Sequence, residues 1–320
     1  MKVFFLGWKA RYEQIMIDCV AKHYDVRRYA VPRYAKRLNR WVKILNRRIA
    51  PRFSADWLAR RINARLQVGP GDLLICNEGE AYRGFNPNLV RTFSGARVLL
   101  VRDLVDEAFL VKMRGQFDAI YSFDAEQCQA LGMQFLDQFF PYSVDEAKAW
   151  NATVPHSNVR PKCYYLGRDK GRAAYITQLG KELGDCGCEV DFNILRDETS
   201  QAGSPYYMDA LLSYEANLRK VVEADVLVEV NQQGQMGLTL RPLEALYFDK
   251  KLITTNRSIK GFDFYDPARF YVLGEEERTI AQFIAATPAP VAHAVLERYS
   301  PVTMLARLLA DTQSIRGAHA

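Results

Sequence analysis

The stretch ADVLVEVNQQGQMGLTLRPLEAL, residues 224–246, joins a short apolar run to a glycine-containing turn and then to a helical pattern. An apolar run of this length, bounded by turn residues, is typical of a buried parallel strand. Gly234 and Gly237 permit a tight turn, and Pro242 is acceptable in the first turn of the helix. The segment KLITTN, residues 251–256, supplies the next strand, so this part of the chain predicts a β-α-β unit.

The same alternation of strands and helices extends outward from this stretch over most of the chain. Strands that alternate with helices pair in parallel, with helices on both faces of the sheet. We therefore predict an α/β fold with two Rossmann-like, doubly wound parallel-sheet domains. Strands are expected at residues 2–7, 25–31, 72–77, 97–103 and 117–124, with 135–142 closing the first half, and at 162–169, 188–195, 224–230 and 251–256. Helices are expected at 12–23, 34–49, 172–183, 207–222 and 242–248.

The segment 144–161 is polar, ends between prolines and has no sustained periodicity, so we predict the interdomain linker there. The predicted domains are residues 1–150 and 151–287. A C-terminal helix within 288–320, kinked at Pro301, is expected to return toward the first domain. Ligands of open α/β sheets bind beyond the carboxyl ends of the strands, which predicts a site in a cleft between the domains.

The composition is that of a folded globular protein, because 49% of the 320 residues are hydrophobic and 25% are charged. No apolar run approaches the roughly 20 residues that span a bilayer, and the N-terminal segment lacks the pattern of an export signal. The six cysteines are scattered, mostly in apolar segments where a thiol acts as a small hydrophobic group. We therefore expect a cytoplasmic protein.

Residues 27–65 are strongly basic, with thirteen Arg or Lys and one acid, whereas the rest of the chain has 30 basic and 36 acidic residues. The helical pattern from Tyr34 to Ile49 carries an apolar stripe beside these basic residues. Such a helix suits an anionic membrane surface, here the inner face of the cytoplasmic membrane, or a phosphorylated glycolipid. The alternative is a solvated helix that packs by its stripe; nucleic acid is disfavoured because no binding motif accompanies the charge. The stripe consists of Leu38, Trp41, Val42, Leu45 and Ile49.

The turn after the strand at 224–230 suits an anion such as phosphate. A glycine turn that opens into a helix presents N–H groups and the positive end of the helix dipole. This helix begins at Thr239 or Leu240, and Arg241 and Glu244 share one of its faces because they are three residues apart. The simpler alternative is an ordinary β-α loop whose Arg and Glu form a surface pair.

This segment resembles the donor-binding segment of GT-B glycosyltransferases, particularly the bacterial lipopolysaccharide and capsule glycosyltransferases and CgeB-like proteins. In that family a glycine loop precedes a helix whose glutamate holds the nucleotide ribose, and Glu244 matches that glutamate. A second segment, YYLGRDKGR at 164–172, resembles the family's diphosphate-contacting loop; the alternative is a basic surface turn. The donor site is thus expected to contain Gly167, Arg168, Lys170, Gly237, Thr239, Arg241 and Glu244, with Gln232, Gln233 and Gln235 as candidates for hydrogen bonds to the base or sugar.

The sequence departs from the family pattern at one position. Many retaining members have two glutamates separated by seven residues, but the position eight before Glu244 is Met236, and the nearest earlier acid is Glu229. Whether the reaction inverts or retains the configuration at the anomeric carbon of the sugar therefore stays open. No Asp-x-Asp motif occurs, the four histidines lie far apart, and Cys186 and Cys188 have no partners at zinc-site spacing. We predict no metal and no cofactor, with a nucleotide sugar as co-substrate.

A catalytic base is expected in the first domain, just beyond the carboxyl end of a strand, where an acidic side chain could take the proton of the acceptor hydroxyl. Two loops qualify: NEGEAYRG, with Glu78 and Glu80, and RDLVDE, with Asp103, Asp106 and Glu107. We prefer Asp103 because it lies at the strand end, with Glu78 and Asp106 as further candidates. Acids at such positions also cap helices, and that alternative stays open.

Together these features predict a metal-independent glycosyltransferase that moves a sugar from a nucleotide donor to a hydroxyl of a bacterial surface glycan, lipopolysaccharide or capsule. The first domain is expected to bind the glycan or glycolipid acceptor, and the second domain the nucleotide sugar. Two alternatives remain: a non-catalytic two-domain α/β protein that binds sugar or nucleotide, and a nucleotide-sugar epimerase with the GT-B fold. An epimerase would convert its donor without an acceptor.

Overall fold

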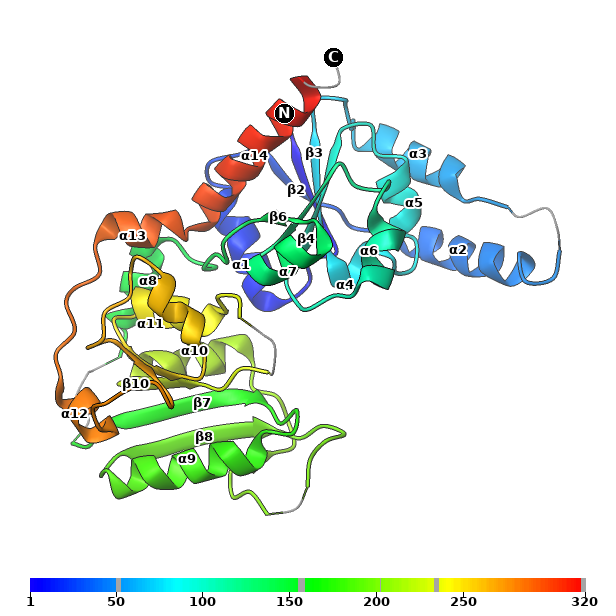
Figure 1. Ribbon diagram of the computed structural model, residues 1–320. Helices are drawn as coiled ribbons and strands as arrows, with labels where there is room; N and C mark the ends of the chain where they lie inside the picture. Colours follow the sequence, from blue (N-terminus) through cyan, green and yellow to red (C-terminus); the bar gives the residue numbers. More distant parts are fainter. Residues whose placement is uncertain (50–52, 155–158, 202, 233–235, 318–320) are drawn as a thin grey trace. The chain divides into compact units, whose positions relative to one another are not determined.

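The computed structural model describes residues 1–49, 53–154, 159–201, 203–232 and 236–317. The chain divides into two compact units, one made of residues 1–137 with 301–320, and the other of residues 138–300. Each unit contains a parallel sheet with flanking helices (Figure 1).

The sheet of the first unit has the strand order β2-β1-β3-β4-β5-β6, and all neighbours run parallel. Val3 of β1 lies opposite Val26 on one side and Leu73 on the other, so the order reverses at β1. Its central strands are buried, as expected where helices cover both faces. The strands are β1 (Val3–Leu6), β2 (Val26–Arg28), β3 (Leu73–Asn77), β4 (Ala96–Val101), β5 (Ala119–Ser122) and β6 (Gln134–Phe135).

The helices of the first unit come from both ends of the chain. The C-terminal helix α14 contacts α1, and Tyr121 of β5 donates a hydrogen bond to Asp311 of α14 at 3.1 Å. Helix α3 contacts α5, and the C-terminal part of α2 extends away from the sheet (Figure 1). The helices are α1 (Arg11–Val20), α2 (Arg33–Leu45), α3 (Asp56–Arg65), α4 (Glu78–Ala81), α5 (Asn86–Arg91), α6 (Glu107–Met113), α7 (Ala125–Leu131) and α14 (Pro301–Gly317).

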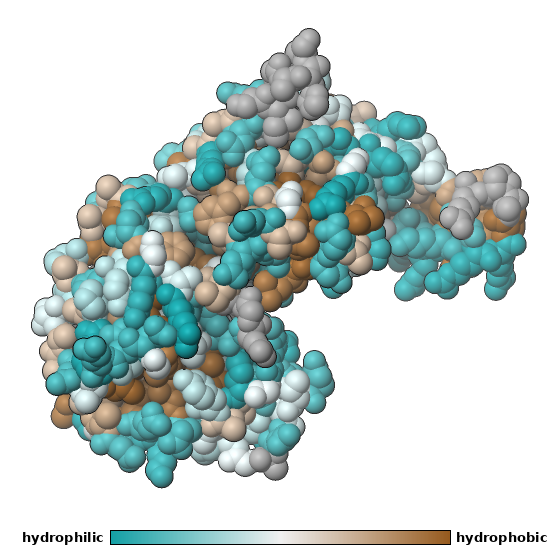
Figure 2. Space-filling view, viewed as in Figure 1, coloured by the Kyte–Doolittle hydropathy of each residue, from teal (hydrophilic) through white to brown (hydrophobic). Residues whose placement is uncertain are grey.

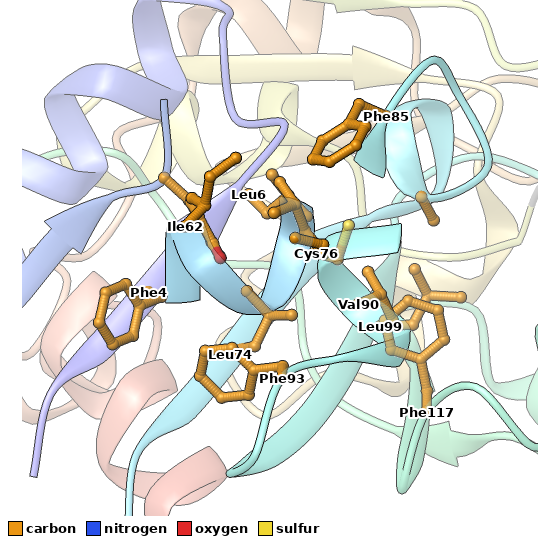
Figure 3. Packing of buried hydrophobic residues seen from close by; sticks show 14 of the residues in the cluster. Phe4, Leu6, Ile62, Leu74, Cys76, Phe85, Val90, Phe93, Leu99 and Phe117 are labelled. Atoms are coloured by element: carbon orange, nitrogen blue, oxygen red, sulfur yellow. The ribbon is translucent and has the colours of Figure 1, made fainter. Parts of the chain in front are cut away.

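A hydrophobic core packs this sheet against α3 and α5 (Figure 3). Phe4 and Leu74 project from neighbouring strands, and Ile62 and Val90 come from the two helices. The ring of Phe4 meets that of Phe93 edge to face, with centroids 5.6 Å apart. Burial of each such side chain stabilises the fold by about 1.5–3 kcal/mol, which holds the strand ends in fixed positions.

The sheet of the second unit has the order β12-β11-β10-β7-β8-β9, again parallel throughout. Counted from β7, this is the 3-2-1-4-5-6 order of dinucleotide-binding Rossmann domains, and its order reverses between β7 and β10. The strands are β7 (Lys162–Arg168), β8 (Glu189–Leu195), β9 (Tyr207–Met208), β10 (Val226–Glu229), β11 (Lys251–Thr254) and β12 (Phe270–Val272).

Helix α9 covers this sheet with Ile176, Leu179 and Leu183, which recur at helical spacing and pack against strand residues such as Ile194 and Val226. The helical segments of the second unit are α8 (Val144–Asn151), α9 (Ala173–Asp185), α10 (Tyr214–Glu223), α11 (Leu240–Tyr247), the 3₁₀ turn η1 (Arg257–Gly261), α12 (Ile280–Ala285) and α13 (His293–Arg298).

The predicted α/β fold with two Rossmann-like parallel sheets is confirmed, but several segments differ from expectation. The strand expected to close the first half over 135–142 is limited to Gln134–Phe135. The segment expected to be a linker contains α8, because Ser143 and Glu146 form a capping box that starts a helix. The helix expected over 207–222 begins only at Tyr214, after the Ser213 cap, whereas Tyr207 pairs with β8 as an edge strand.

The C-terminal segment also differs, because two separate helices replace one kinked helix. Helix α13 ends at Arg298, and Pro301 is the first residue of α14. Proline fits that position because its missing N–H is not needed in the first turn of a helix. The strand β12 and helix α12 were not predicted at all. Among the described residues, no helix is both long and apolar enough to cross a membrane.

Candidate functional site

Crevices form in open α/β sheets beyond the carboxyl ends of strands, at the point where the strand order reverses. In the second unit that point lies between β7 and β10. The segment after β7 contains the predicted residues 167–170, and the segment after β10 leads to α11 with Thr239 and Glu244. The two predicted donor segments therefore lie at the same crevice of one unit.

Gly167 is required at the end of β7 by lack of space. An added Cβ would lie 2.5 Å from the hydroxyl of Tyr165 and 3.0 Å from the carbon that bears it. The Tyr165 ring is buried and packs against Phe192, with ring centroids 5.7 Å apart. Only glycine, which has no Cβ, therefore fits at position 167 beside the Tyr165 ring.

The turn after β7 is held by Asp169, which is buried. Its carboxylate accepts hydrogen bonds from the Ala173 amide at 2.9 Å and from the Tyr207 hydroxyl at 2.6 Å. Burial raises the pKa of Asp169, but these hydrogen bonds outweigh it and hold the pKa below its ordinary value. Asp169 is not among the predicted site residues, although an acid at the end of a strand that precedes a helix is a recognisable capping signal.

The backbone of Lys170 is left-handed, with φ of +47°, and Gly171 follows with φ of +77°. Their amides donate to the Asp197 carboxylate at 2.9 Å and to the Thr199 hydroxyl at 2.7 Å. These two amides are engaged by side chains of the loop after β8. The charge available to a ligand is therefore in the exposed side chains of Arg168 and Lys170.

Arg172 links the two strand ends of the crevice. Its guanidinium donates to the carbonyl of Arg168 at 2.7 Å, to that of Asp169 at 3.1 Å and to that of Val230 just after β10. Arg172 belongs to the predicted diphosphate loop at 164–172 but is not among the predicted site residues. It fixes the positions of both predicted donor segments relative to each other within the unit.

Helix α11 begins as predicted, with Thr239 as its cap and Leu240 as its first residue. The Thr239 hydroxyl accepts from the Arg241 amide at 3.2 Å. Arg241 and Glu244 form an ion pair at 2.5 Å, with side-chain exposures of 13% and 7%, so the pair is not the solvated surface pair of the simpler alternative. The Arg241 guanidinium also lies over the Tyr164 ring at 5.5 Å.

Glu229, at the end of β10, is a second buried carboxylate beside this pair. It accepts hydrogen bonds from the hydroxyls of Thr239 and, at 2.6 Å, Thr254. Burial raises the pKa of both Glu229 and Glu244, and the Glu229 charge raises the pKa of Glu244 further, whereas Arg241 opposes both shifts. In the sequence, Glu229 stands out only as an acid out of register with the family pattern. The crevice brings it within electrostatic range of Glu244.

The glycine turn itself is described in part. Gln235, with Gln233 and Gly234, lies outside the described residues. The carbonyl of Gly237 accepts from the Asn256 side chain at 3.3 Å, and that of Met236 accepts from the Ser258 hydroxyl at 2.5 Å. The end of the turn is thus tied to the segment after β11.

In the first unit the strand order reverses at β1, so the equivalent crevice lies beyond β1 and β3. Glu78 is the first residue after β3, half-buried, and it accepts from the Arg102 amide at 3.2 Å. Burial raises the pKa of Glu78. Glu80 is paired with Lys9 at 2.6 Å.

Asp103 and Asp106 differ from Glu78 in being exposed. Asp103 accepts from the adjacent Leu104 amide at 2.9 Å, and Asp106 caps α6 by accepting from the Phe109 amide at 2.8 Å. The capping alternative therefore holds for Asp106. Glu107, in the first turn of α6, pairs with Arg114 at 2.6 Å.

A cluster around Arg102 was missed by the sequence analysis. The guanidinium lies over the rings of Tyr12 and Trp8, at 5.0 and 5.8 Å from their centroids, and 4.0 Å from the Glu13 carboxylate. Glu13 is buried and also accepts from the Ala10 amide at 2.8 Å. These residues come from two segments far apart in the sequence, the one after β1 and the one after β4, so only the sheet order reveals that they meet.

Helix α2 is the centre of the basic stretch. Leu38 and Val42 pack against the core of the first unit, whereas Trp41 is 69% exposed. The predicted single stripe therefore splits into a packed part, Leu38 and Val42, and an exposed part, Trp41, Leu45 and Ile49. Figure 2 shows hydrophilic side chains along much of this helix. Further exposed apolar residues of the basic stretch are Tyr34, Ile44, Phe53 and Trp57.

Comparison with known proteins identifies the fold. No family model and no curated protein sequence matches the chain. Among solved structures, it is similar to a UDP-forming α,α-trehalose-phosphate synthase from Burkholderia vietnamiensis, with a TM-score of 0.57 and 10% identity over 98% of each chain. The enzyme from Burkholderia xenovorans in complex with glucose 6-phosphate also has a TM-score of 0.57, with 9% identity over 98% of this chain and all of that one. An α-glucosyltransferase in complex with UDP and DNA gives 0.52, with 11% identity over 98% and 91% of the two chains.

The fold is the GT-B fold of glycosyltransferases. At these identities the likeness concerns the backbone, and the chemistry has to be argued from the side chains. Within the described part of the chain, no group of three or more His, Cys, Asp or Glu side chains is arranged to hold a metal ion.

Proposed function

We propose that this protein is a glycosyltransferase that transfers a sugar from a nucleotide-activated donor to a hydroxyl group. The observation that carries the proposal is the crevice of the second unit, where the Glu244-bearing helix and the loop with Arg168 and Lys170 follow the two strands at which the sheet order reverses. In α/β sheets of this order, that crevice is the place for a nucleotide.

The donor would be bound through three kinds of contact. Glu244 can accept hydrogen bonds from the two ribose hydroxyls, since a carboxylate has several lone pairs and Arg241 engages one of its oxygens. Arg168 and Lys170 can neutralise the diphosphate, whose negative charge grows as the glycosidic bond breaks. The N-terminus of α11, capped by Thr239, adds the positive end of a helix dipole.

Metal independence is part of this proposal, because the two cations and the helix terminus supply the charge that a divalent ion supplies elsewhere. No other cofactor is required for the transfer. The test is turnover in the presence of EDTA: the rate should be unchanged, and a rate that is lost and then restored by Mg²⁺ or Mn²⁺ would contradict this part of the proposal.

The first unit would bind the acceptor and supply the base. Glu78 suits the base better than Asp103, because it is half-buried beside the crevice and burial raises its pKa, which makes its carboxylate a stronger proton acceptor. The finer proposal is an acceptor that belongs to a bacterial surface glycan, lipopolysaccharide or capsule, assembled at the cytoplasmic face of the membrane.

Contact with an anionic membrane is supported by the exposed part of α2. Trp41 and Leu45 are one turn apart and exposed, and basic residues flank them throughout residues 27–65. Each Lys or Arg near such a surface contributes about 1 kcal/mol. Co-sedimentation with phosphatidylglycerol vesicles should fall when Trp41 is changed to Ser, whereas Trp150→Ser, in the second unit, should bind as the wild type does.

The activity test is to incubate the protein with each common nucleotide sugar and follow the donor by ³¹P and ¹H NMR, with and without a lipopolysaccharide-core or capsule oligosaccharide. A glycosyltransferase releases the nucleotide faster when its acceptor is present. Conversion of the sugar without acceptor and without release would establish the epimerase alternative. Binding of a donor with no turnover under any condition would leave the binding-protein alternative.

A further inference from the structure

A cavity of about 590 Å³ lies in the first unit, within the size range of small-molecule sites. It lies at the carboxyl ends of β1 and β2 and beside the segment after β3, so it adjoins the crevice of this sheet. Its walls include the buried aromatic side chains of Phe5, Trp8, Tyr29 and Phe85. The cavity is therefore an apolar depression in the position expected for a ligand.

The charged residues of this cavity are mostly cations. Lys9, Arg28, Lys36 and Arg83 line it, and Glu80 is the carboxylate among the lining residues. The four cations are exposed, so they surround the aromatic walls at the solvent side.

The carboxylates nearby do not neutralise these cations. Glu80 is shared by Lys9 at 2.6 Å and Arg83 at 3.8 Å. Arg28 has its own partner in Asp18, at 2.5 Å. Lys36, at the start of α2, forms no ion pair with any residue that the structure describes. Four cations against two carboxylates leave about two positive charges around one concave surface, where the field of like charges is concentrated.

We infer that this cavity binds an acceptor that carries a phosphate group, with the anion held by Lys36 and Arg83 and the apolar face of its sugar toward the aromatic walls. This inference rests on the proposed function and names the substrate class of the acceptor. A phosphomonoester or diphosphate matches the charge, because it carries one to two negative charges near neutral pH and accepts hydrogen bonds from both Lys and Arg. The group belongs to a soluble sugar phosphate or to a lipid headgroup.

The test uses ¹⁹F NMR of protein labelled with 5-fluorotryptophan. The chain has four tryptophans, of which Trp8 lines the cavity and Trp150 lies in the second unit. Inorganic phosphate and methyl phosphate serve as probes. We expect the Trp8 resonance to shift in a saturable way at millimolar concentrations while that of Trp150 stays in place, which excludes a general effect of salt.

A double variant tests whether Lys36 and Arg83 hold the phosphate. Lys36→Ser combined with Arg83→Gln should weaken the binding of phosphate seen at Trp8 about fivefold, which corresponds to about 1 kcal/mol for the two exposed charges together. The control combines Lys112→Ser with Arg65→Gln, which removes the same charge from exposed positions that do not line the cavity. A Trp8 shift that is absent in the wild type, or equal in both double variants, would overturn the inference.

Two further arms separate the possible sources and the two proposals. Vesicles that contain phosphatidic acid should shift Trp8 only if a lipid phosphate can enter the cavity, whereas a shift with methyl phosphate alone identifies a soluble acceptor; either result supports the phosphate site. Binding of UDP or another nucleotide is measured on the same samples. Nucleotide binding without a Trp8 shift would refute the phosphate site and leave the glycosyltransferase proposal standing. A Trp8 shift without binding of any nucleotide would support the phosphate site and contradict the glycosyltransferase proposal.

Discussion

Replacement of Gly167 by Ala tests whether the end of β7 can accommodate a side chain at this position. The added Cβ would lie 2.5 Å from the Tyr165 hydroxyl and 3.0 Å from the ring carbon that bears it, closer than side-chain carbons approach their neighbours. Tyr165 is only 3% exposed and packed on Phe192, so its ring has little room to move. The clash between the added Cβ and Tyr165 can be relieved only if the ring or the strand shifts.

The expected cost follows from this geometry. Forcing an extra carbon into a packed site costs about 1–3 kcal/mol, and the loss of glycine flexibility in the unfolded chain returns about 0.4–1 kcal/mol. We therefore expect Gly167→Ala to destabilise the second unit, by up to about 2.5 kcal/mol. Adding Tyr165→Phe removes the closest contact but leaves the ring carbon, and should recover part of that loss.

The assay is equilibrium unfolding in urea, with hydrogen exchange of the β7 amides to localise the effect. Gly184→Ala is the matched control, because Gly184 lies within α9 and has no atom within 4 Å of the added Cβ. That variant should be more stable than the wild type by up to about 1 kcal/mol. Equal shifts for Gly167→Ala and Gly184→Ala would refute the steric argument. Nucleotide affinity should fall in the first variant only.

Three further predictions concern buried charges. Burial lowers the pKa of Lys250 to about 8, below the ordinary value that it has in the unfolded chain, so the cost of its buried charge is fully present below pH 8 and is lost as the pH rises toward the unfolded-state pKa. The stability of the wild type relative to Lys250→Met should therefore rise by about 2.5 kcal/mol between pH 7 and pH 10, and thermal unfolding in that range without such a rise would contradict this. Because burial raises the pKa of Glu229, its carboxylate is unfavourable above the unfolded-state pKa; Glu229→Gln should raise the melting temperature at pH 7.5 and lose that advantage as the pH falls to 4.5, whereas a pH-independent difference would argue against a buried charge. Glu78→Gln should lower kcat about 100-fold or more if Glu78 is the base, with Asp103→Asn near wild type, and the opposite order would restore the Asp103 hypothesis.

Local patterns in the sequence predict much of this fold. Apolar runs such as VFFL and LLICN form buried strands because their burial on both faces requires continuous hydrophobicity, and the helix after the glycine turn begins at Leu240 as its proline and threonine indicate. The failures have local causes too. The edge strand at Tyr207 is too short to show a period, and the capping box at Ser143 was overlooked within a polar segment.

The site is predicted less completely, because its residues are far apart in the sequence and are brought together only by the order of the strands in the sheet. Glu244 and Arg241 could be paired from their spacing, but the contact of Glu229 with Thr239 depends on how β10 is placed relative to α11. The cluster of Arg102 with Tyr12 and Glu13 likewise depends on the order of β1, β3 and β4. The exposure of Trp41 could not be predicted from the helical stripe, since the stripe does not show which of its residues contact the core; in the structure Leu38 and Val42 do so.

The central claim is that the second unit binds a nucleotide through Glu244. The most direct measurement is a thermal-shift series with UDP, GDP, CMP, ADP and NAD on the wild type, on Glu244→Ala and on Glu182→Ala, which removes an exposed glutamate from α9. A ligand that binds only the folded state raises the apparent stability by mass action. We predict that one nucleotide stabilises the wild type and Glu182→Ala and has no effect on Glu244→Ala; stabilisation of all three proteins alike, or of none by any nucleotide, would contradict the donor-site assignment.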